Sequence, residues 1–216
     1  MTVRILLACL LVAAMGAVAD DDDEGFDPIF NGMDLSGWVG AERGYKAEDG
    51  VLVADSPSGN LYTEAEYGDF VLRFSFKLTP GGNNGIGVRV PLDKRASKEG
   101  LEIQVLDDTA EKYAGKLKPW QHHGSVYGIV PAEPGHLRPV GEWNEQEIRV
   151  EGTKVRVTLN GAVIVDTDLE PWRQGKPFMD DKEHPGVMRD SGRISLAGHK
   201  SEVHFRDLRV KRLDAR

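Results

Sequence analysis

Cysteine is almost absent from this 216-residue chain. Its single cysteine, Cys9, lies in an apolar run near the N-terminus, so the remainder has no disulfide, thiol nucleophile or thiolate ligand. No later apolar run approaches the ~20 residues that a membrane-spanning helix needs. A helical stripe of apolar residues is also missing from every segment of ten or more residues after that run. A strand-built hydrophobic core must therefore stabilise the fold.

Charge of one sign is nowhere concentrated in the body of the chain. The formal net charge is −8, but basic and acidic residues are interleaved, which excludes the basic stripe typical of nucleic-acid binding. A Gly-x-Ser-x-Gly elbow and a dinucleotide fingerprint are absent, and the glycines at 81–85 precede a predicted strand, not a helix. Serine hydrolase and nucleotide chemistry are disfavoured.

The N-terminus has the pattern of a cleavable secretory signal. Arg4 precedes an apolar run that ends in the small residues Ala17 and Ala19, before an acidic cluster. We predict a signal peptide at 1–19, an acidic solvated tail at 20–27 and one domain at 28–213. The mature chain is expected to be soluble, without a membrane span, and exported to the periplasm or the exterior.

Alternation of apolar and polar residues predicts the strands. From Phe70 to Leu78 every even-numbered residue is apolar, whereas Arg73, Ser75 and Lys77 face the other way. The segment 147–166 predicts a three-stranded meander whose second turn contains the hairpin dipeptide Asn160-Gly161. Its apolar face would hold Ile148, Val150, Val155, Val157, Leu159, Val163 and Val165.

Two further strands are expected at 193–197 and 202–211, the second with a bulge near Asp207, where the alternation slips. Long irregular segments at 107–124 and 170–191 interrupt the pattern and are of the length that functional loops have. Many short strands without covering helices predict an all-β jelly-roll sandwich of two antiparallel sheets.

Polar side chains gather on the two strands predicted at 83–91 and 101–106. If Ile86, Val88 and Val90 face the core, alternation places Arg89, Glu102 and Gln104 together on the outer surface. A guanidinium, a carboxylate and an amide can together bind the hydroxyl groups of a sugar. The competing interpretation is a solvated sheet face with a cross-strand ion pair.

Neighbouring residues bear on this choice. Glycines around these strands would allow a ligand to approach the backbone; they are Gly82, Gly85, Gly87 and Gly100. Tyr113, Trp120 and Tyr127, in the adjoining loops, could stack on a sugar ring or pack within the loops. His199 shares an alternation face with the outer residues of its strand, although a surface imidazole is an equal alternative. No helical zinc motif is present.

The chain resembles the bacterial 3-keto-disaccharide hydrolase family along nearly all of its expected mature length. The similarity lies in FNGMDLSGWVG (30–40), FVLRFSFKL (70–78), NNGIGVRVP (83–91), LEIQVLDD (101–108), GSVYGIVPA (124–132), PVGEWNEQEI (139–148), HPGVMRDSGRISLAGH (184–199) and VHFRDLRV (203–210). This resemblance implies a concanavalin A-like jelly roll that acts on glycosides oxidised at C3 of the sugar.

A C3 ketone acidifies the hydrogen on C2, so the resemblance implies proton abstraction, elimination of the C1 substituent and addition of water. On this hypothesis Glu102 or His199 is the base, and Arg89 with Gln104 stabilises the enolate. Tyr127 or His184 would protonate the leaving group, while Trp120 stacks on it. The remaining expected substrate contacts are Asn84, Asp107 and Arg189.

Two alternatives stay open at this stage. A divalent cation could replace Arg89 as the electrophile, with Glu102, His199 and Asp107 as ligands; no other cofactor is expected. The chain could instead be a non-catalytic, lectin-like carbohydrate-binding module or a structural domain of the cell envelope, because the fold alone does not determine function. Carbohydrate is the expected partner, and nothing in the pattern specifies an oligomeric state.

Overall fold

The computed structural model describes residues 24–55 and 57–213. The predicted signal peptide and the first four residues of the acidic tail lie outside the described residues. Within the described residues, no helix combines the length and the apolar character that crossing a bilayer would require. Asp27, the last residue of the predicted tail, is the first residue of strand β1 (Asp27–Pro28).

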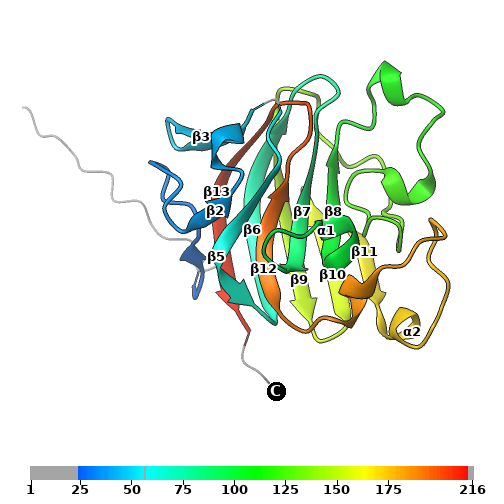
Figure 1. The fold of residues 1–216 in the computed structure, drawn as a ribbon. Coiled ribbons are helices and arrows are strands. Elements are labelled where there is room, and N and C mark those ends of the chain that lie inside the picture. Colours follow the sequence, from blue (N-terminus) through cyan, green and yellow to red (C-terminus); the bar gives the residue numbers. More distant parts are fainter. Residues whose placement is uncertain (1–23, 56, 214–216) are drawn as a thin grey trace, which may run out of the picture.

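Two antiparallel sheets pack face to face (Figure 1). The larger sheet has the order β11 (Ala162–Asp168), β10 (Lys154–Leu159), β9 (Trp143–Glu151), β6 (Phe70–Leu78), β13 (Val203–Arg212), β4 (Val51–Ala54), β3 (Tyr45–Glu48), with β1 (Asp27–Pro28) also paired to β13. The smaller sheet has the order β2 (Trp38–Gly40), β5 (Asn60–Tyr67), β12 (Gly192–Ala197), β7 (Asn83–Val90), β8 (Leu101–Leu106). The predicted jelly-roll sandwich is confirmed.

Helical segments are short. In the described part of the chain, the α-helices are α1 (Ala96–Glu99) and α2 (Glu170–Arg173), and the 3₁₀ turns are η2 (Glu42–Gly44), η3 (Glu111–Tyr113), η4 (Pro119–Gln121) and η5 (Pro185–Met188). Helix α1 lies in the connection between β7 and β8 and packs against both strands. Its position on the outer face of the smaller sheet (Figure 1) forms one wall of the site described below.

The core lies between the sheets and follows the predicted alternation closely. Strand β6 has the predicted bounds, and its side chains Phe70, Phe76 and Leu72 are completely buried. Phe205 of the neighbouring β13 packs 6.2 Å from the ring of Phe74. Period-two burial on one face of each sheet is what a sandwich core requires.

The predicted meander forms, with one difference in its last strand. Asn160 and Gly161 adopt φ values of +50° and +86°, as the predicted hairpin turn requires. The pairing of β10 with β11 shifts register between Val157 and Thr158. Because such a shift changes which face the following residues present, Val163 is 47% exposed while Val165 is buried. The assignment of Val163 to the core was wrong.

The predicted bulge in the last strand is confirmed. Asp207 has φ +54°, and the pairing of β13 with β6 shifts register between Arg206 and Arg209. Residues on both sides of the shift, Val203 and Val210, remain buried, as does Leu208 within it. The bulge thus keeps apolar residues inward after the alternation slips.

The two long loops lie beyond the β8 edge of the smaller sheet (Figure 1). The backbone amide of Gln104 donates to the carbonyl of Ser125, and the amide of Tyr127 donates to the carbonyl of Glu102. The segment that follows the 107–124 loop therefore hydrogen-bonds to backbone groups at the edge of β8, which would otherwise be open to pairing with another chain. It also brings Tyr127 next to the outer face of β8.

Candidate active site

Glu102 is the most unusual ionisable group on the outer face of the smaller sheet. It projects from β8, yet only 7% of the residue is exposed. The hydroxyl of Ser97, on α1, hydrogen-bonds to its carboxylate. Helix α1 therefore both shields the carboxylate from solvent and supplies it with a donor.

Burial controls the acidity of this carboxyl group. Desolvation raises the pKa of Glu102 to about 7, while the Ser97 hydrogen bond and the charge of Arg95 act in the opposite direction. A buried carboxylate is destabilised relative to its protonated form because it has lost its hydration. Perturbed acids in cavities are candidates for functional groups, and Glu102 meets both conditions.

A cavity of about 200 Å³ opens beside this carboxyl group. Its walls come from the outer face of β7 and β8, from α1, from the loop that follows β8 and from the end of β12. They consist of Asn83, Arg95, Ser97, Glu102, Gln104, Leu106, Tyr113, Leu117, Gln121, Tyr127 and His199. Amide, hydroxyl, guanidinium and aromatic groups thus converge on one buried carboxyl.

Three of the predicted site residues line this cavity together with Glu102. Gln104 donates from Nε2 to Oδ1 of Asn83 at 3.2 Å, which orients both amides. Tyr127 accepts a hydrogen bond at its hydroxyl from Gln121 Nε2 at 3.4 Å. Trp120 does not line the cavity itself, but it packs edge-on against Tyr127 with ring centroids 4.9 Å apart. The third residue is His199.

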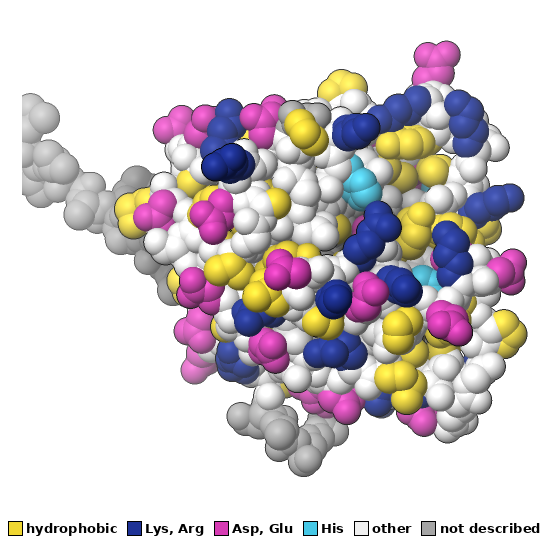
Figure 2. Space-filling model, in the orientation of Figure 1, with side chains coloured by type: hydrophobic (Ala, Val, Ile, Leu, Met, Phe, Trp, Pro, Cys, Tyr) yellow, Lys and Arg dark blue, Asp and Glu magenta, His cyan; other side chains and the backbone are white. Residues whose placement is uncertain are grey.

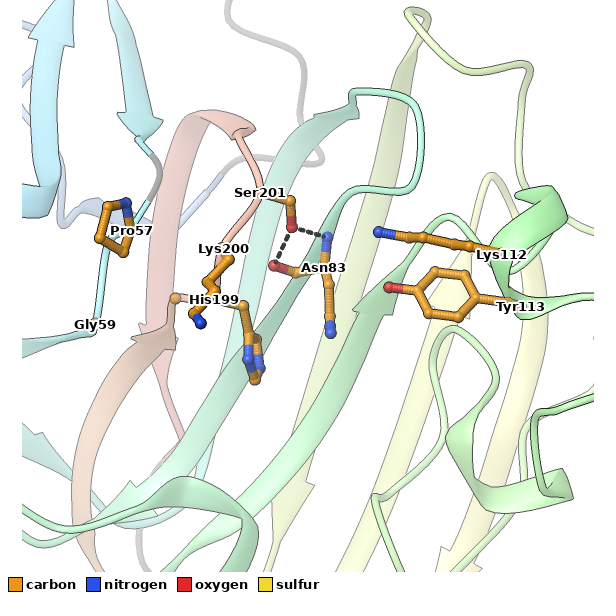
Figure 3. A pocket seen from close by; sticks show the side chains of 9 residues that line it. Pro57, Gly59, Asn83, Lys112, Tyr113, His199, Lys200 and Ser201 are labelled. Atoms are coloured by element: carbon orange, nitrogen blue, oxygen red, sulfur yellow. Dashed lines mark hydrogen bonds between the residues drawn. The ribbon is translucent and has the colours of Figure 1, made fainter.

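His199 lies at the rim, where the first cavity meets a second one of about 470 Å³ (Figure 3). Asn83, Tyr113 and His199 line both cavities. Partial desolvation and the nearby charge of Arg95 lower the pKa of His199 below its ordinary value of 6.5. The imidazole is therefore neutral at pH 7 and available as a hydrogen-bond donor or a base.

Arg89 does not join this group, contrary to the sequence expectation. Pairing of β12 with β7 places Val88 and Arg89 opposite a single residue of β12, and Arg89 has φ +55°. This bulge turns the Arg89 side chain away, so that its guanidinium donates to Asp69 Oδ1 at 2.9 Å and to the carbonyls of Gly68 and Gly152. Arg89 is a buried structural residue.

The same bulge places the Val90 side chain on the opposite face of the sheet from the predicted one. Val90 is completely buried, but it clusters with Tyr62 and Ala96 instead of entering the main core. A bulge inserts one residue into the alternation, so the residues beyond it change faces. Ile86 and Val88 face the main core as expected, whereas Val90 packs beneath α1 on the outer side.

Four other expected substrate contacts are placed elsewhere. Asn84 points inward next to Tyr45 and is completely buried; its neighbour Asn83 lines the cavity instead. Asp107 accepts hydrogen bonds from Gly81 and Thr109, which closes a turn. His184 is buried against Asp180 at 2.9 Å and Phe178. Arg189 donates to the carbonyl of Arg89.

The strand glycines make room for protein atoms, not for a ligand. A Cβ at Gly85 would overlap the Glu102 carboxylate, and one at Gly87 would overlap Ser195 and Ala96. A Cβ at Gly100 would meet Val90. These small residues therefore allow Glu102 and α1 to pack closely on the sheet.

Comparison with known proteins shows the family to which the chain belongs. Residues 25–211 match the family described as the 3-keto-alpha-glucoside-1,2-lyase-like domain. The chain belongs to this family. A relative from Bacteroides thetaiotaomicron, the 3-keto-disaccharide hydrolase, is 28% identical over 89% of this chain and 80% of its own length.

The fold of this chain is also similar to those of solved structures. A candidate glycosyl hydrolase of Parabacteroides distasonis ATCC 8503 is 29% identical, with a TM-score of 0.77 over 87% of this chain and 99% of that one. A carbohydrate-binding module, CBM66 of Bacillus subtilis, is 12% identical with a TM-score of 0.54 over 81% of this chain and 95% of its own. The latter likeness shows the shared fold alone.

The sequence patterns did not predict several of the residues that line the cavity. Arg95 and Ser97 come from α1, a four-residue helix too short to produce an apolar stripe. Tyr113, expected from the sequence as a loop aromatic that could stack on a sugar ring or pack in its loop, comes from η3 and lines the cavity. Of the residues that were missed, only Asn83 could have been predicted, because alternation places it on the same sheet face as Gly85 and Gly87.

Figure 2 shows charges of both signs scattered over the described part of the molecular surface in this view.

Proposed function

We propose that this protein cleaves 3-keto glycosides by removing the C2 proton of the oxidised sugar and eliminating the C1 substituent. Water then adds across the enone, which completes a net hydrolysis. The observation that carries the proposal is Glu102, a buried carboxyl whose pKa is raised to about 7, beside a cavity of about 200 Å³. Membership in the family and the activity named for the Bacteroides relative support the same substrate class.

The chemistry requires a base stronger than an ordinary carboxylate. A ketone at C3 makes the C2 hydrogen acidic because the resulting anion is delocalised onto the ketone oxygen. A carboxylate whose conjugate acid has a pKa near the working pH combines basicity with a useful fraction in the ionised form. Glu102 has this property because the sheet, α1 and the long loop desolvate it.

Arg95 is the electrophile in this proposal. It lines the cavity from the start of α1, and its charge acts on both Glu102 and His199. A positioned cation beside the ketone oxygen stabilises the negative charge that develops there. Gln104 and Asn83, whose amides are bonded to each other, would orient the sugar hydroxyls. Arg95 thus takes the role that the sequence assigned to Arg89.

His199 is placed to assist the departing group. It lies where the two cavities meet, so a glycosidic oxygen that joins a sugar in the first cavity to an aglycone in the second would pass beside it. A neutral imidazole carries one N–H donor, which can hydrogen-bond to the departing oxygen. That oxygen takes its proton from solvent at the open rim, while Glu102 retains the proton from C2.

An ordinary glycosidase mechanism has less support. That route uses two carboxyl groups that flank the glycosidic bond. Among the described residues that line the first cavity, Glu102 is the only carboxyl group. A single base with a nearby cation suits elimination next to a ketone better than oxocarbenium chemistry.

A divalent cation stays part of the proposal, but with fewer protein ligands than the sequence predicted. Glu102 and His199 both line the cavity, but Asp107 is bonded to Gly81 and Thr109. In the described part of the chain, no group of three or more His, Cys, Asp or Glu side chains is arranged to hold a metal. A cation would therefore need ligands from the substrate, and such an ion would polarise the ketone oxygen.

The test measures aglycone release from a 3-keto glucoside and from its unoxidised parent, with and without a chelator. We expect cleavage of the keto substrate alone and a fall in kcat of at least about 100-fold in Glu102→Gln. Glu99→Gln is the matched control, because Glu99 is an acid on α1 whose side chain does not line the cavity.

Each result decides a separate part of the proposal. Equal cleavage of the parent would refute the requirement for a ketone, and full activity in Glu102→Gln would refute the assignment of the base. Loss of activity with a chelator, restored by added metal, would show the divalent cation. Binding of the sugar without cleavage of either substrate would leave a carbohydrate-binding module.

A further inference from the structure

The second cavity has an unusual charge for this acidic protein. It is lined by Pro57, Gly59, Asn83, Lys112, Tyr113, Gly198, His199, Lys200 and Ser201 (Figure 3). Two of these residues are lysines, and none of the described lining residues is an acid. The whole chain carries a formal charge of −8. A local excess of cations in a concave site attracts anions and raises their local concentration.

The wall that carries Lys200 is held in place by its neighbours. The amide of Gly198 donates to the carbonyl of Gly59 at 2.7 Å, and the amide of Ser58 donates to the carbonyl of His199 at 3.1 Å. Ser201 Oγ accepts from the Asn83 amide at 2.8 Å and donates to the Asn83 carbonyl at 3.2 Å. The backbone beside Lys200 is therefore bonded to two other segments, which favours a preformed site.

The opposite wall presents Lys112 together with an aromatic ring. In Figure 3, Lys112 and Tyr113 point from η3 toward Asn83. The Lys112 ammonium lies 4.8 Å from the centroid of the Tyr113 ring and close to Gly81, where a Cβ would meet it. Asp107, which bonds the Gly81 amide, is already engaged by Thr109 as well. Among the described residues, the Lys112 ammonium forms no ion pair, so it remains available to an anion in the cavity.

We infer that this second cavity accepts the leaving group of the substrate, and that this leaving group carries a carboxylate. The inference rests on the proposed function, because Asn83, Tyr113 and His199 join this cavity to the one that contains Glu102. Lys112 and Lys200 would bind the carboxylate. Two kinds of leaving group share this chemistry: a hydroxylated aromatic acid, whose ring would lie against Tyr113, and a uronic acid.

The kinetic test compares the 3-keto glucosides of 4-hydroxybenzoate and 4-hydroxybenzamide, which have nearly the same shape but differ in charge. The expected kcat/KM favours the carboxylate about fivefold in the wild type, because exposed ion pairs are individually weak. The preference disappears in Lys112→Gln/Lys200→Gln and decreases with added salt. Lys154→Gln/Lys176→Gln is the control, since it removes the same charge away from both cavities.

A binding test keeps this inference separate from the proposed function. Free 4-hydroxybenzoate, 4-hydroxybenzamide, glucuronate and glucose are titrated by NMR into the wild type and both double variants. Tighter binding of one acid than of its neutral partner, lost only in Lys112→Gln/Lys200→Gln, supports the inference and identifies the kind of leaving group. Equal binding of acid and neutral partner overturns it, whether or not the keto glucosides are cleaved. Cleavage without a charge preference overturns the inference and leaves the proposed function standing.

Discussion

The Glu102 side chain lies next to Gly85 of the neighbouring strand, diagonal to its own register partner Gly87. The register pairs Gly85 with Gln104 and Gly87 with Glu102, yet a Cβ on Gly85 would overlap the Glu102 carboxylate. The side chain therefore leans along the sheet, into the space that the glycine leaves open. The absence of a side chain at position 85 determines where the proposed base can be.

Gly85→Ala should displace this base. The new methyl group needs the space of the Glu102 carboxylate, so we expect kcat to fall at least about tenfold, because general-base catalysis depends on hydrogen-bond-scale geometry. Steady-state kinetics with a 3-keto glucoside tests this. Gly68→Ala is the control, since a Cβ there makes only an ordinary contact of 3.4 Å. An unchanged kcat in a folded Gly85→Ala protein would contradict the assignment of Glu102.

The pH dependence of kcat/KM should show an ascending limb near pH 7. Glu102 acts as a base only when ionised, and its pKa is about 7. The Ser97 hydrogen bond lowers this pKa, so Ser97→Ala should move the limb to higher pH. A pH profile of both proteins gives the answer. A limb that stays in place after Ser97→Ala would indicate that another group is the base.

His123 should make the folded protein sensitive to acid. Its ring is stacked on Phe76 at 5.0 Å, and Nδ1 accepts the Leu106 amide while Nε2 faces Gln146 Oε1 at 3.0 Å. Desolvation lowers the pKa of His123 from 6.5 to about 4. Between these values the unfolded chain binds the proton and the folded one does not. Stability is therefore lost as pH falls from 6.5 to 4, by about 3 kcal/mol at most.

Urea unfolding of the wild type and His123→Gln at several pH values tests this contribution. The variant is expected to be less stable at pH 7.5 but to lose less stability on acidification. His136→Gln, which alters a half-buried histidine in a loop, should follow the wild type. Parallel curves for all three proteins would exclude His123 as the source of the acid sensitivity.

Glu102 should act on stability in the opposite sense. Its pKa is raised from 4.5 to about 7, so the folded state binds the proton more readily and this residue favours folding as pH falls from 7 to 4.5. It therefore masks part of the His123 effect. Glu102→Gln should steepen the acid-induced loss of stability in urea unfolding. A slope as shallow as that of the wild type would argue against a raised pKa for Glu102.

Arg89 should matter for folding and not for turnover. Its guanidinium is buried and bonded to Asp69 and to carbonyls of separate segments. Arg89→Met removes the donor to the carbonyls of Gly68 and Gly152 and the cationic partner of Asp69, and should lower the free energy of unfolding by about 3 kcal/mol. Urea unfolding measures this loss, and kcat of the folded protein should stay within about twofold. A large drop in kcat with intact stability would return Arg89 to the active site.

The accuracy of the sequence predictions varied with the regularity of the backbone. Strand β6, the Asn160-Gly161 turn and the bulge at Asp207 were all predictable, because each depends on local alternation or on a local backbone preference. Arg89 and Val163 were misplaced because irregular pairing reverses alternation. No local sequence pattern predicts either shift. At Arg89 the backbone even adopts a positive φ, which arginine rarely does.

The cavity shows the same division. Glu102 and Gln104 could be placed on one face because they are two residues apart on one strand, and His199 because it follows a strand in alternation. Arg95 and Ser97 could not, since they reach the cavity from α1, in a connection whose path depends on packing over the sheet. Tyr113 could be expected only as an aromatic near the site, because no alternation in its loop predicts where its ring lies. Local patterns carry no information on where such connections cross.

The sequence by itself determined the two-sheet architecture, the family and the strand that carries the proposed base, because period-two burial and motif order are properties of the linear chain. Only the tertiary structure decided the proposed electrophile, the depth of the cavity and the raised pKa of Glu102. Each of these depends on desolvation and on charges from segments that are distant along the chain. Those quantities arise when α1 and the long loop close over β8.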